Sequence, residues 1–255
     1  MKIVSLVENT ASRDDLAAEH GLSLYIETHG YRILFDAGQS GAFADNGKKL
    51  GIDLRTVDFA VLSHGHYDHG GGMSRFLELN SVAPVYLSPY AFEEHHNRNG
   101  KFIGLNPNLA ESDRLRFVDG CIQLGPGITV VDQVPCVYPI EAYGLTMGRG
   151  IPEDFRHEIY LLIEDNGQRI CISGCSHRGI LNIMEYFRPD ILVGGFHFKD
   201  MDADAPGLEL AAAKLASFPT TYYTGHCTGQ RQMEKLKPIL GTRLLPLSAG
   251  FVYVF

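Results

Sequence analysis

Four side chains able to bind a metal ion fall within six consecutive positions of this chain. They form an H-x-H-x-D-H pattern made by His64, His66, Asp68 and His69. Imidazole and carboxylate groups are the ligands expected for Zn²⁺, Fe²⁺ or Mn²⁺ at a hydrolytic centre. A solvated histidine-rich turn is the alternative, but this spacing after an apolar run is far more specific than a histidine pair. The pattern therefore predicts a metal-binding loop.

The segments on either side of this loop indicate how it is held. The apolar run from Val57 to Leu62 is typical of a buried strand, and Met73 to Leu79 is typical of a helix. Between them, the glycines at 70–72 carry no Cβ and allow the backbone to turn tightly. We therefore expect the four side chains in a strand-to-helix loop, where alternate residues can converge on one point.

Three further histidines each follow a predicted buried strand and have a glycine close by. They are His177, His197 and His226. The carboxyl ends of strands are where α/β folds collect ligands. One such histidine is more often a hydrogen-bonded structural residue, but three of them beside the metal-binding loop favour a shared site.

The predicted elements fall into two similar halves. Each half contains a hairpin, a buried strand and a histidine-bearing loop. The first hairpin joins Leu22–Thr28 to Tyr31–Phe35 through His29-Gly30, and the second joins Ile159–Ile163 to Arg169–Ser173 around Asn166-Gly167. Helices are expected at Ala42–Leu50, Ile180–Phe187, Ala205–Ser217 and Thr228–Leu236. No segment resembles a linker, so we expect residues 1–255 to form one domain.

Two stretches have little periodicity, from Asn97 to Arg114 and from Pro135 to Asp154. Irregular connections this long are usually functional loops or lids. The segment before the first of them, Pro89 to His96, is expected to start a helix. His95 and His96 are then expected on its exposed face rather than as metal ligands.

Composition limits the classes of partner. The chain has 255 residues, 45% hydrophobic and 20% charged, with a formal net charge of −8. No basic run is present, which argues against nucleic acid as a main partner. No apolar run approaches the length of a membrane span, and the first residues do not resemble a signal peptide. Five scattered cysteines without CxxC pairs favour a reducing cytoplasm. The oligomeric state, including a homo-oligomer, stays open.

The H-x-H-x-D-H loop resembles the signature of the metallo-β-lactamase superfamily. The run from Gly30 to Gly38 is similar to an earlier strand of that superfamily followed by Asp-x-Gly. The segments Gly174–Ile180, Gly194–His197 and Thr224–Gly229 resemble one branch, the dihydropterin-(ribofuranosyl)aminobenzene-phosphate synthase-like proteins, usually described as metal-dependent hydrolases. This resemblance and the order of the elements both fit an α/β (α+β) fold of four layers, an αββα sandwich.

The resemblance also implies a set of metal ligands. One divalent ion would bind His64, His66 and His177, and a second would bind Asp68, His69 and His226. Zn²⁺ is expected first, with Mn²⁺ or Fe²⁺ as alternatives, and occupancy could be one or two. Members with two metals usually have a bridging aspartate where this chain has Cys175. Cys175 as a thiolate ligand and as a small buried residue both stay open, and His157 is an outside candidate for the third histidine.

Roles in a reaction follow from the same resemblance. Asp68 would be a metal ligand or would orient the attacking water. His197 would act as general acid or contact a substrate phosphate, because a neutral-range pKa suits proton transfer. Asp36 would orient the metal-binding loop. The candidates for contacting an anionic substrate are His20, Arg98, Lys101 and Arg149.

These features lead to a metal-dependent hydrolase whose metal activates water to attack an anionic small-molecule ester, with a phosphoester expected first. The alternative implied by the resemblance is a transferase of the 7,8-dihydropterin-6-methyl-4-(β-D-ribofuranosyl)aminobenzene-5'-phosphate synthase type, which would join a pterin to a ribosyl-aminobenzene phosphate. A non-catalytic, metal-stabilised binding protein is a third interpretation, against which the intact loop argues. A β-lactamase role is not expected. Resistance enzymes of this fold act outside the cytoplasm, whereas the first residues of this chain do not resemble a signal peptide.

Overall fold

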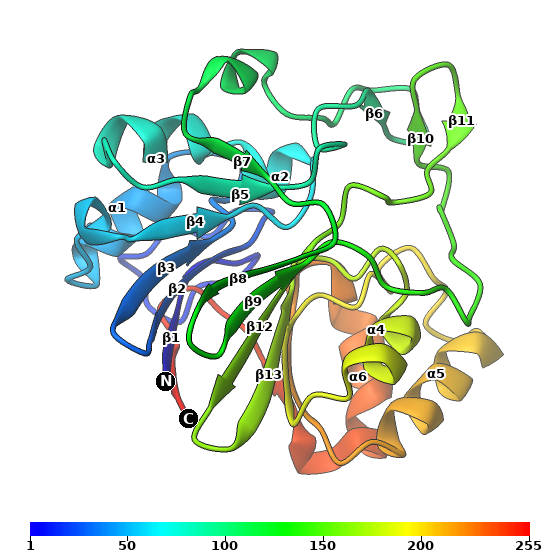
Figure 1. Cartoon of the computed structure of the whole chain (residues 1–255). Helices are drawn as coiled ribbons and strands as arrows, with labels where there is room; N and C mark the ends of the chain where they lie inside the picture. Colours follow the sequence, from blue (N-terminus) through cyan, green and yellow to red (C-terminus); the bar gives the residue numbers. More distant parts are fainter.

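Two seven-stranded sheets form the centre of the molecule in a computed structural model that describes all 255 residues (Figure 1). The first sheet has the order β17-β1-β2-β3-β4-β5-β7. Its strands are β1 (Lys2–Val7), β2 (Ser23–Thr28), β3 (Tyr31–Phe35), β4 (Phe59–Val61), β5 (Val85–Leu87), β7 (Leu115–Phe117) and β17 (Val252–Val254).

The second sheet has the order β16-β15-β14-β13-β12-β9-β8. Its strands are β8 (Cys121–Gly125), β9 (Ile128–Val131), β12 (Tyr160–Asp165), β13 (Gln168–Ser173), β14 (Ile191–Gly194), β15 (Thr221–Thr224) and β16 (Leu244–Pro246). In both sheets an antiparallel hairpin leads into a run of parallel strands: β3-β4-β5-β7 in the first sheet and β13-β14-β15-β16 in the second. The two similar halves predicted from the sequence are therefore present.

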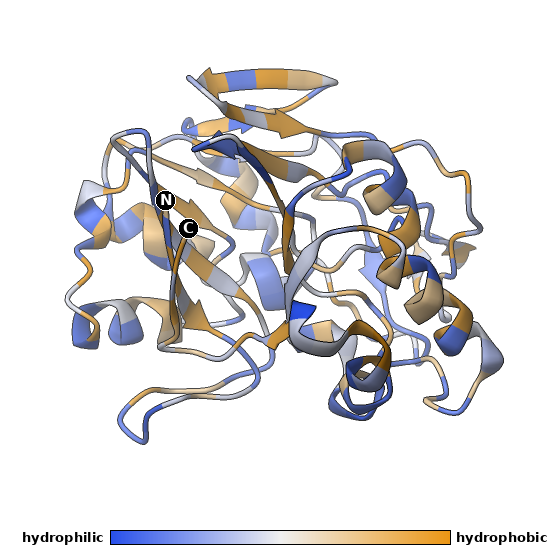
Figure 2. Ribbon diagram, turned by 90° about the horizontal axis from the view of Figure 1, so that it is seen from below, coloured by the Kyte–Doolittle hydropathy of each residue, from blue (hydrophilic) through white to orange (hydrophobic).

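Helices cover the outer faces of both sheets. On the first sheet lie α1 (Ala42–Lys49) and α3 (Met73–Leu79), and on the second α4 (Ile180–Phe187), α5 (Pro206–Ala216) and α6 (Gln230–Leu240) (Figure 1). One apolar cluster, with Phe35 and Ile172, joins strands of the two sheets, and two others join a sheet to its helices. In Figure 2 the strands are mostly hydrophobic and the surface loops mostly hydrophilic. The structure confirms the αββα sandwich.

Local sequence signals predicted both hairpins correctly. His29 and Gly30 in the first turn, and Asn166 and Gly167 in the second, all have positive φ angles. Asn-Gly accepts this conformation readily, which matches the twist of the flanking strands.

None of the helices is long and apolar enough to cross a membrane.

The predicted helix start at Pro89–His96 is wrong. His95 and His96 instead form a two-residue strand, β6, which pairs with β10 (Thr146–Met147). With β11 (Ile151–Pro152), these strands form a small third sheet beside the sandwich (Figure 1). The segment before the first irregular stretch therefore pairs with the second stretch, a long-range pairing that no local periodicity reports.

The metal-binding loop is also more ordered than predicted. A one-turn helix, α2 (Tyr67–Gly70), begins directly after His66. Asp68 and His69 therefore lie on a helical turn rather than on an open loop.

Candidate metal centre

The carboxyl ends of four strands bring the predicted histidines together. His64 follows β4, His177 follows β13, His197 follows β14 and His226 follows β15. Two of these histidines have positive φ angles, His197 at 54° and His226 at 45°. Ser176, directly before His177, has a φ of 61°. Positive φ is uncommon outside glycine, and such residues cluster at functional sites.

The first group of potential ligands consists of His64, His66 and His177, whose ligand atoms lie within 4.8 Å of one another. All three side chains are buried. His64 Nε2 and both ring nitrogens of His177 have no hydrogen-bond partner. Burial and the neighbouring histidines hold the pKa values of His64 and His177 well below their usual range, so both rings are neutral. Buried lone pairs without partners are costly, and a cation would satisfy them.

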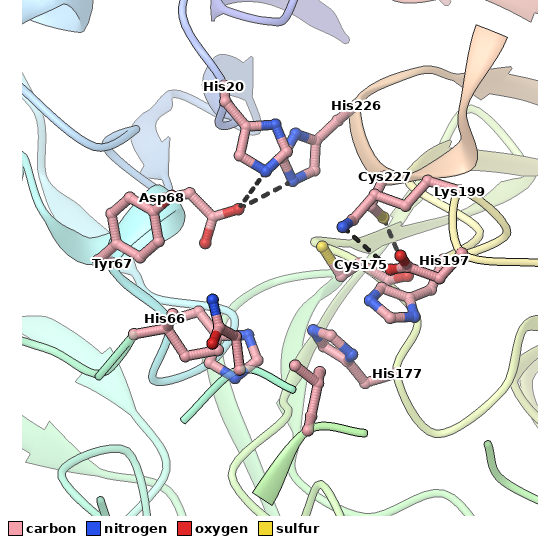
Figure 3. A pocket seen from close by; sticks show the side chains of 14 residues that line it. His20, His66, Tyr67, Asp68, Cys175, His177, His197, Lys199, His226 and Cys227 are labelled. Atoms are coloured by element: carbon pink, nitrogen blue, oxygen red, sulfur yellow. Dashed lines mark hydrogen bonds and ion pairs between the residues drawn. The ribbon is translucent and has the colours of Figure 1, made fainter. Parts of the chain in front are cut away.

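The second group lies around Asp68. Its Oδ2 is 3.3 Å from His20 Nε2 and 3.4 Å from His226 Nε2 (Figure 3). Burial alone would raise the pKa of Asp68, but the contacts with His20 and His226 outweigh it and hold that pKa well below its usual range. His69 Nε2 lies 3.1 Å from His226 Nε2. A carboxylate and three imidazoles therefore converge beside the first group.

Hydrogen bonds determine which ring nitrogens are free. Ser63 Oγ donates to Asp36 Oδ2 at 2.7 Å, so it must accept from His64 Nδ1 at 2.8 Å. His69 Nδ1 donates to Asp36 Oδ2 at 2.6 Å, and His226 Nδ1 donates to Asn9 Oδ1 at 3.0 Å. Each of the three histidines therefore carries its proton on Nδ1 and directs an Nε2 lone pair inward. Asp36 orients the loop, as the sequence predicted.

The close approach of His69 and His226 needs a positive charge between them. Two neutral rings with Nε2 lone pairs facing at 3.1 Å would repel each other. Burial would lower the pKa of His69, but the carboxylates of Asp36 and Asp68 raise it to about 9. A proton can therefore occupy this position when no metal ion does.

Two buried glutamates that sequence reasoning missed hold the backbone of the histidine loops. Glu158 accepts from the amides of His177 at 2.8 Å and Arg178 at 3.0 Å. Glu8 accepts from the amide of His226. Burial raises the pKa values of both glutamates. The available signal was an acidic residue next to an apolar strand run, at Val7-Glu8 and at Glu158-Ile159.

A third buried glutamate, Glu153, joins the small sheet to the centre. Its Oε1 is 2.8 Å from His95 Nδ1 and 3.5 Å from His66 Nε2, and its Oε2 is 3.3 Å from His157 Nε2. The Gly65 amide donates to His157 Nδ1 at 2.9 Å, which places the His157 proton on Nε2, facing the carboxylate. The cluster therefore sets one carboxylate against three imidazoles, and its ligand atoms also lie close enough together to hold a metal ion.

This cluster corrects one prediction. His95 is only 1% exposed, not on an exposed helix face, because it packs against Glu153 from the second irregular stretch. His157 faces Glu153 and, with His66, His95 and Glu153, belongs to a third group of potential metal ligands. Burial would raise the pKa of Glu153, but hydrogen bonds from His157, His66 and His95 hold it below its usual range.

A cavity of about 150 Å³ lies beside the two groups of potential ligands. His20, His197 and Lys199 line it, together with Leu145 from the second irregular stretch. Burial and the nearby Lys199 lower the pKa of His197 to about 3, so the expected neutral-range pKa is wrong. A second pocket of about 330 Å³ shares His177 and His197 with the first. Its further lining is mainly apolar and includes Tyr138, Tyr143, Phe196, Phe198 and Met201.

Three predicted substrate residues do not line the cavity. Arg98 lies 3.6 Å from Asp200, which does line it. Lys101 and Arg149 are exposed, and neither lines the cavity.

Comparisons with known proteins agree with this geometry. A family model of the metallo-beta-lactamase superfamily matches residues 17–226. The 7,8-dihydropterin-6-methyl-4-(beta-D-ribofuranosyl)-aminobenzene-5'-phosphate synthase of Methanocaldococcus jannaschii is 29% identical, over 90% of this chain and 88% of that protein. An uncharacterised protein of the same archaeon is 29% identical over 92% of this chain and 93% of its own. The solved structure of Tm1679, a metal-dependent hydrolase of the beta-lactamase superfamily, superposes with a TM-score of 0.87 at 26% identity, covering 100% of this chain and 99% of that one.

Gly174, in the second half of the molecule, packs tightly against Ser63 and Asp36 of the first half. A Cβ at this position would lie 2.2 Å from Ser63 Oγ and 3.1 Å from Asp36 Oδ2. Gly174→Ala should therefore lower the free energy of unfolding by about 1–3 kcal/mol, measured by urea denaturation. Gly207→Ala is the control, because a Cβ on this residue of α5 meets nothing within 4 Å. An unchanged midpoint for Gly174→Ala would contradict the tight contact.

Proposed function

Because this chain belongs to the metallo-β-lactamase superfamily, we propose that it uses one or two divalent metal ions to hydrolyse an anionic small-molecule ester, in the first instance a phosphoester. The observation that carries the proposal is the set of inward Nε2 lone pairs on His64, His69 and His226. Their outer nitrogens are all engaged, so the inner ones are available to a cation. Such outer partners are characteristic of histidines that bind metals.

The two groups divide the ligands between them. His64, His66 and His177 would hold one ion. Asp68, His69 and His226 would hold the other. Imidazole-rich sets with one carboxylate suit Zn²⁺, with Fe²⁺ or Mn²⁺ as alternatives. A bound divalent ion lowers the pKa of a water molecule and polarises the oxygen of an ester.

The residues around the cavity suit an anion. Asp68 is ionised and can orient a water molecule by accepting its proton in a hydrogen bond. Burial would lower the pKa of Lys199, but Asp200 at 3.1 Å raises it, so Lys199 stays charged at the cavity wall. His197 is neutral and can donate one hydrogen bond to a substrate oxygen. The adjoining apolar pocket can hold a non-polar portion of the substrate.

The same pocket supports the second candidate function, a transferase like the synthase relative. Tyr138, Tyr143 and Phe196 offer flat faces on which an aromatic ring could stack, beside the histidine groups. A non-catalytic metal-binding protein has weaker support, because it would not need a charged lysine and an open cavity beside the ligands. Five free cysteines, two of them at the centre, suit a reducing compartment such as the cytoplasm.

The first test is the metal content of the protein purified without chelator, measured by inductively coupled plasma mass spectrometry. We expect about two equivalents per chain, falling to about one in His226→Ala, since each group would hold one ion. His66→Ala and Asp68→Ala should also lose metal and abolish hydrolysis of a chromogenic phosphodiester. His29→Ala, on the exposed hairpin turn, is the control. Full metal content in the double variant of His66 and Asp68 would refute the assignment.

The anion-binding role of the cavity wall gives a second test. His197→Ala and Lys199→Ala should keep their metal, because neither side chain belongs to the groups of ligands. Their kcat/KM for the phosphodiester should fall by about 10²–10³-fold, as expected for lost contacts to developing charge. Lys235→Ala, an exposed lysine paired with Asp204, should leave kcat/KM unchanged. Loss of metal in His197→Ala would instead identify His197 as a ligand.

Glu153 provides a third test, as a positioning residue. Its Oε1 lies 3.5 Å from His66 Nε2, where it can accept the proton of that nitrogen and leave Nδ1 for the ion. Glu153→Gln cannot accept from three imidazoles and should weaken metal affinity by about 10–100-fold, measured by chelator competition. Asp154→Asn, the adjacent exposed carboxylate, is the matched control. Equal metal affinities in the two variants would show that Glu153 only supports the fold.

A further inference from the structure

Cys175 lies between the two groups of potential metal ligands. It follows Gly174 at the end of β13 and is only 3% exposed. Its Sγ is 3.2 Å from His69 Nε2, within 4.8 Å of the ligand atoms of His64 and His69, and also within that distance of the ligand atom of His226. In Figure 3 the sulfur points toward the middle of the ring of labelled side chains. Among the potential ligands, Cys175 thus reaches histidines of both groups.

The surroundings of Cys175 are not those of a cysteine that merely fills space. Cys171, four residues earlier, is fully buried within the apolar cluster that joins the second sheet to its helices. Cys175 belongs to none of the apolar clusters. It faces His69 Nε2, while His64 Nε2 nearby has no hydrogen-bond partner. A small buried hydrophobe would instead be expected among carbon atoms.

We propose that the thiolate of Cys175 is a metal ligand shared by the two groups. This inference rests on the proposed function only in requiring that the histidine groups bind metal. On binding, the S–H bond breaks, a sulfur–metal bond forms and the proton passes to solvent, with no change of oxidation state. A single negative thiolate beside neutral imidazoles would then balance part of the charge of two divalent ions.

A shared thiolate determines which metal the centre prefers. Thiolate is a soft ligand that favours Zn²⁺ or Fe²⁺, whereas carboxylate and water favour Mn²⁺ or Mg²⁺. The centre should therefore prefer Zn²⁺ over Mn²⁺ more strongly than an otherwise similar site with a carboxylate at this position. Cys175→Asp creates that comparison within the same chain.

Cys227 is the matched control. Its Sγ donates to the backbone oxygen of Cys175 at 3.4 Å, and it lies near Cys175 and His226. Like Cys175, it is buried and lies just after a parallel strand of the second sheet, in this case β15. Unlike Cys175, it is grouped with neither His64 nor His69.

The test is the absorption spectrum of the protein loaded with Co²⁺ in place of the native metal. Cobalt bound to a thiolate gives a sulfur-to-metal charge-transfer band in the near ultraviolet, separate from the weak visible bands that any bound Co²⁺ shows. The wild-type protein and Cys227→Ser should show the charge-transfer band. Cys175→Ser and Cys175→Asp should lose it while keeping visible bands and an unchanged circular dichroism spectrum. Cys175→Asp should also bind Mn²⁺ more tightly relative to Zn²⁺ than the wild type does.

The possible failures are distinguishable. Visible cobalt bands without the charge-transfer band in the wild type would refute the role of Cys175 and leave the metal-dependent function standing. A band that survives in Cys175→Ser and disappears in Cys227→Ser would assign the thiolate to Cys227 and overturn the proposal. A wild-type protein that takes up no Co²⁺ would overturn both proposals. If Cys175→Ser does not fold, the spectrum of Cys175→Asp decides.

Discussion

The buried carboxylate of Asp36 is the interaction on which the site depends. It accepts from the Ser63 amide and hydroxyl and from His69 Nδ1. Because the Ser63 hydroxyl proton is committed to Asp36, its oxygen accepts from His64. One charge in the first sheet thereby sets the free nitrogen of two histidines. A buried carboxylate is tolerated only when donors satisfy it, and these donors come from the strand and loop that the site requires.

The same principle recurs around the centre. Glu158, in the second half of the molecule, accepts from the backbone amide of His177, and Glu8, in the first half, accepts from that of His226. Glu153 lies against the ring of His66. With Asp36 and Asp68, five carboxylates lie in or against the histidine groups, all of them buried. Removing so much negative charge from water needs compensation by hydrogen bonds or by cations. Divalent ions at the centre would supply charge that the hydrogen bonds do not neutralise.

Local signals in the sequence predicted much of the fold and part of the site. The Asn166-Gly167 turn, the periodicity of α3 and α4, and the strand before His64 depend on neighbouring residues and were therefore predictable. The environment of His95 was not, because it depends on Glu153, 58 positions later in the chain. Likewise, His20 reaches Asp68 only because the loop between β1 and β2 folds against α2, far along the chain. Glu8 and Glu158 were overlooked because one acidic residue beside a strand has no spacing pattern to mark it.

The left-handed backbone of Ser176, His197 and His226 has a consequence for how this protein can be altered. Each such residue costs of order 1–3 kcal/mol, which the surrounding structure must offset. Glycine would relax the backbone at each position, but at 197 and 226 it would remove the imidazole that the loop exists to present. A search for thermostable variants should accordingly find few improvements in these loops and more on the outer helices. Such a distribution is the usual trade-off between stability and activity, here located at the ends of β13, β14 and β15.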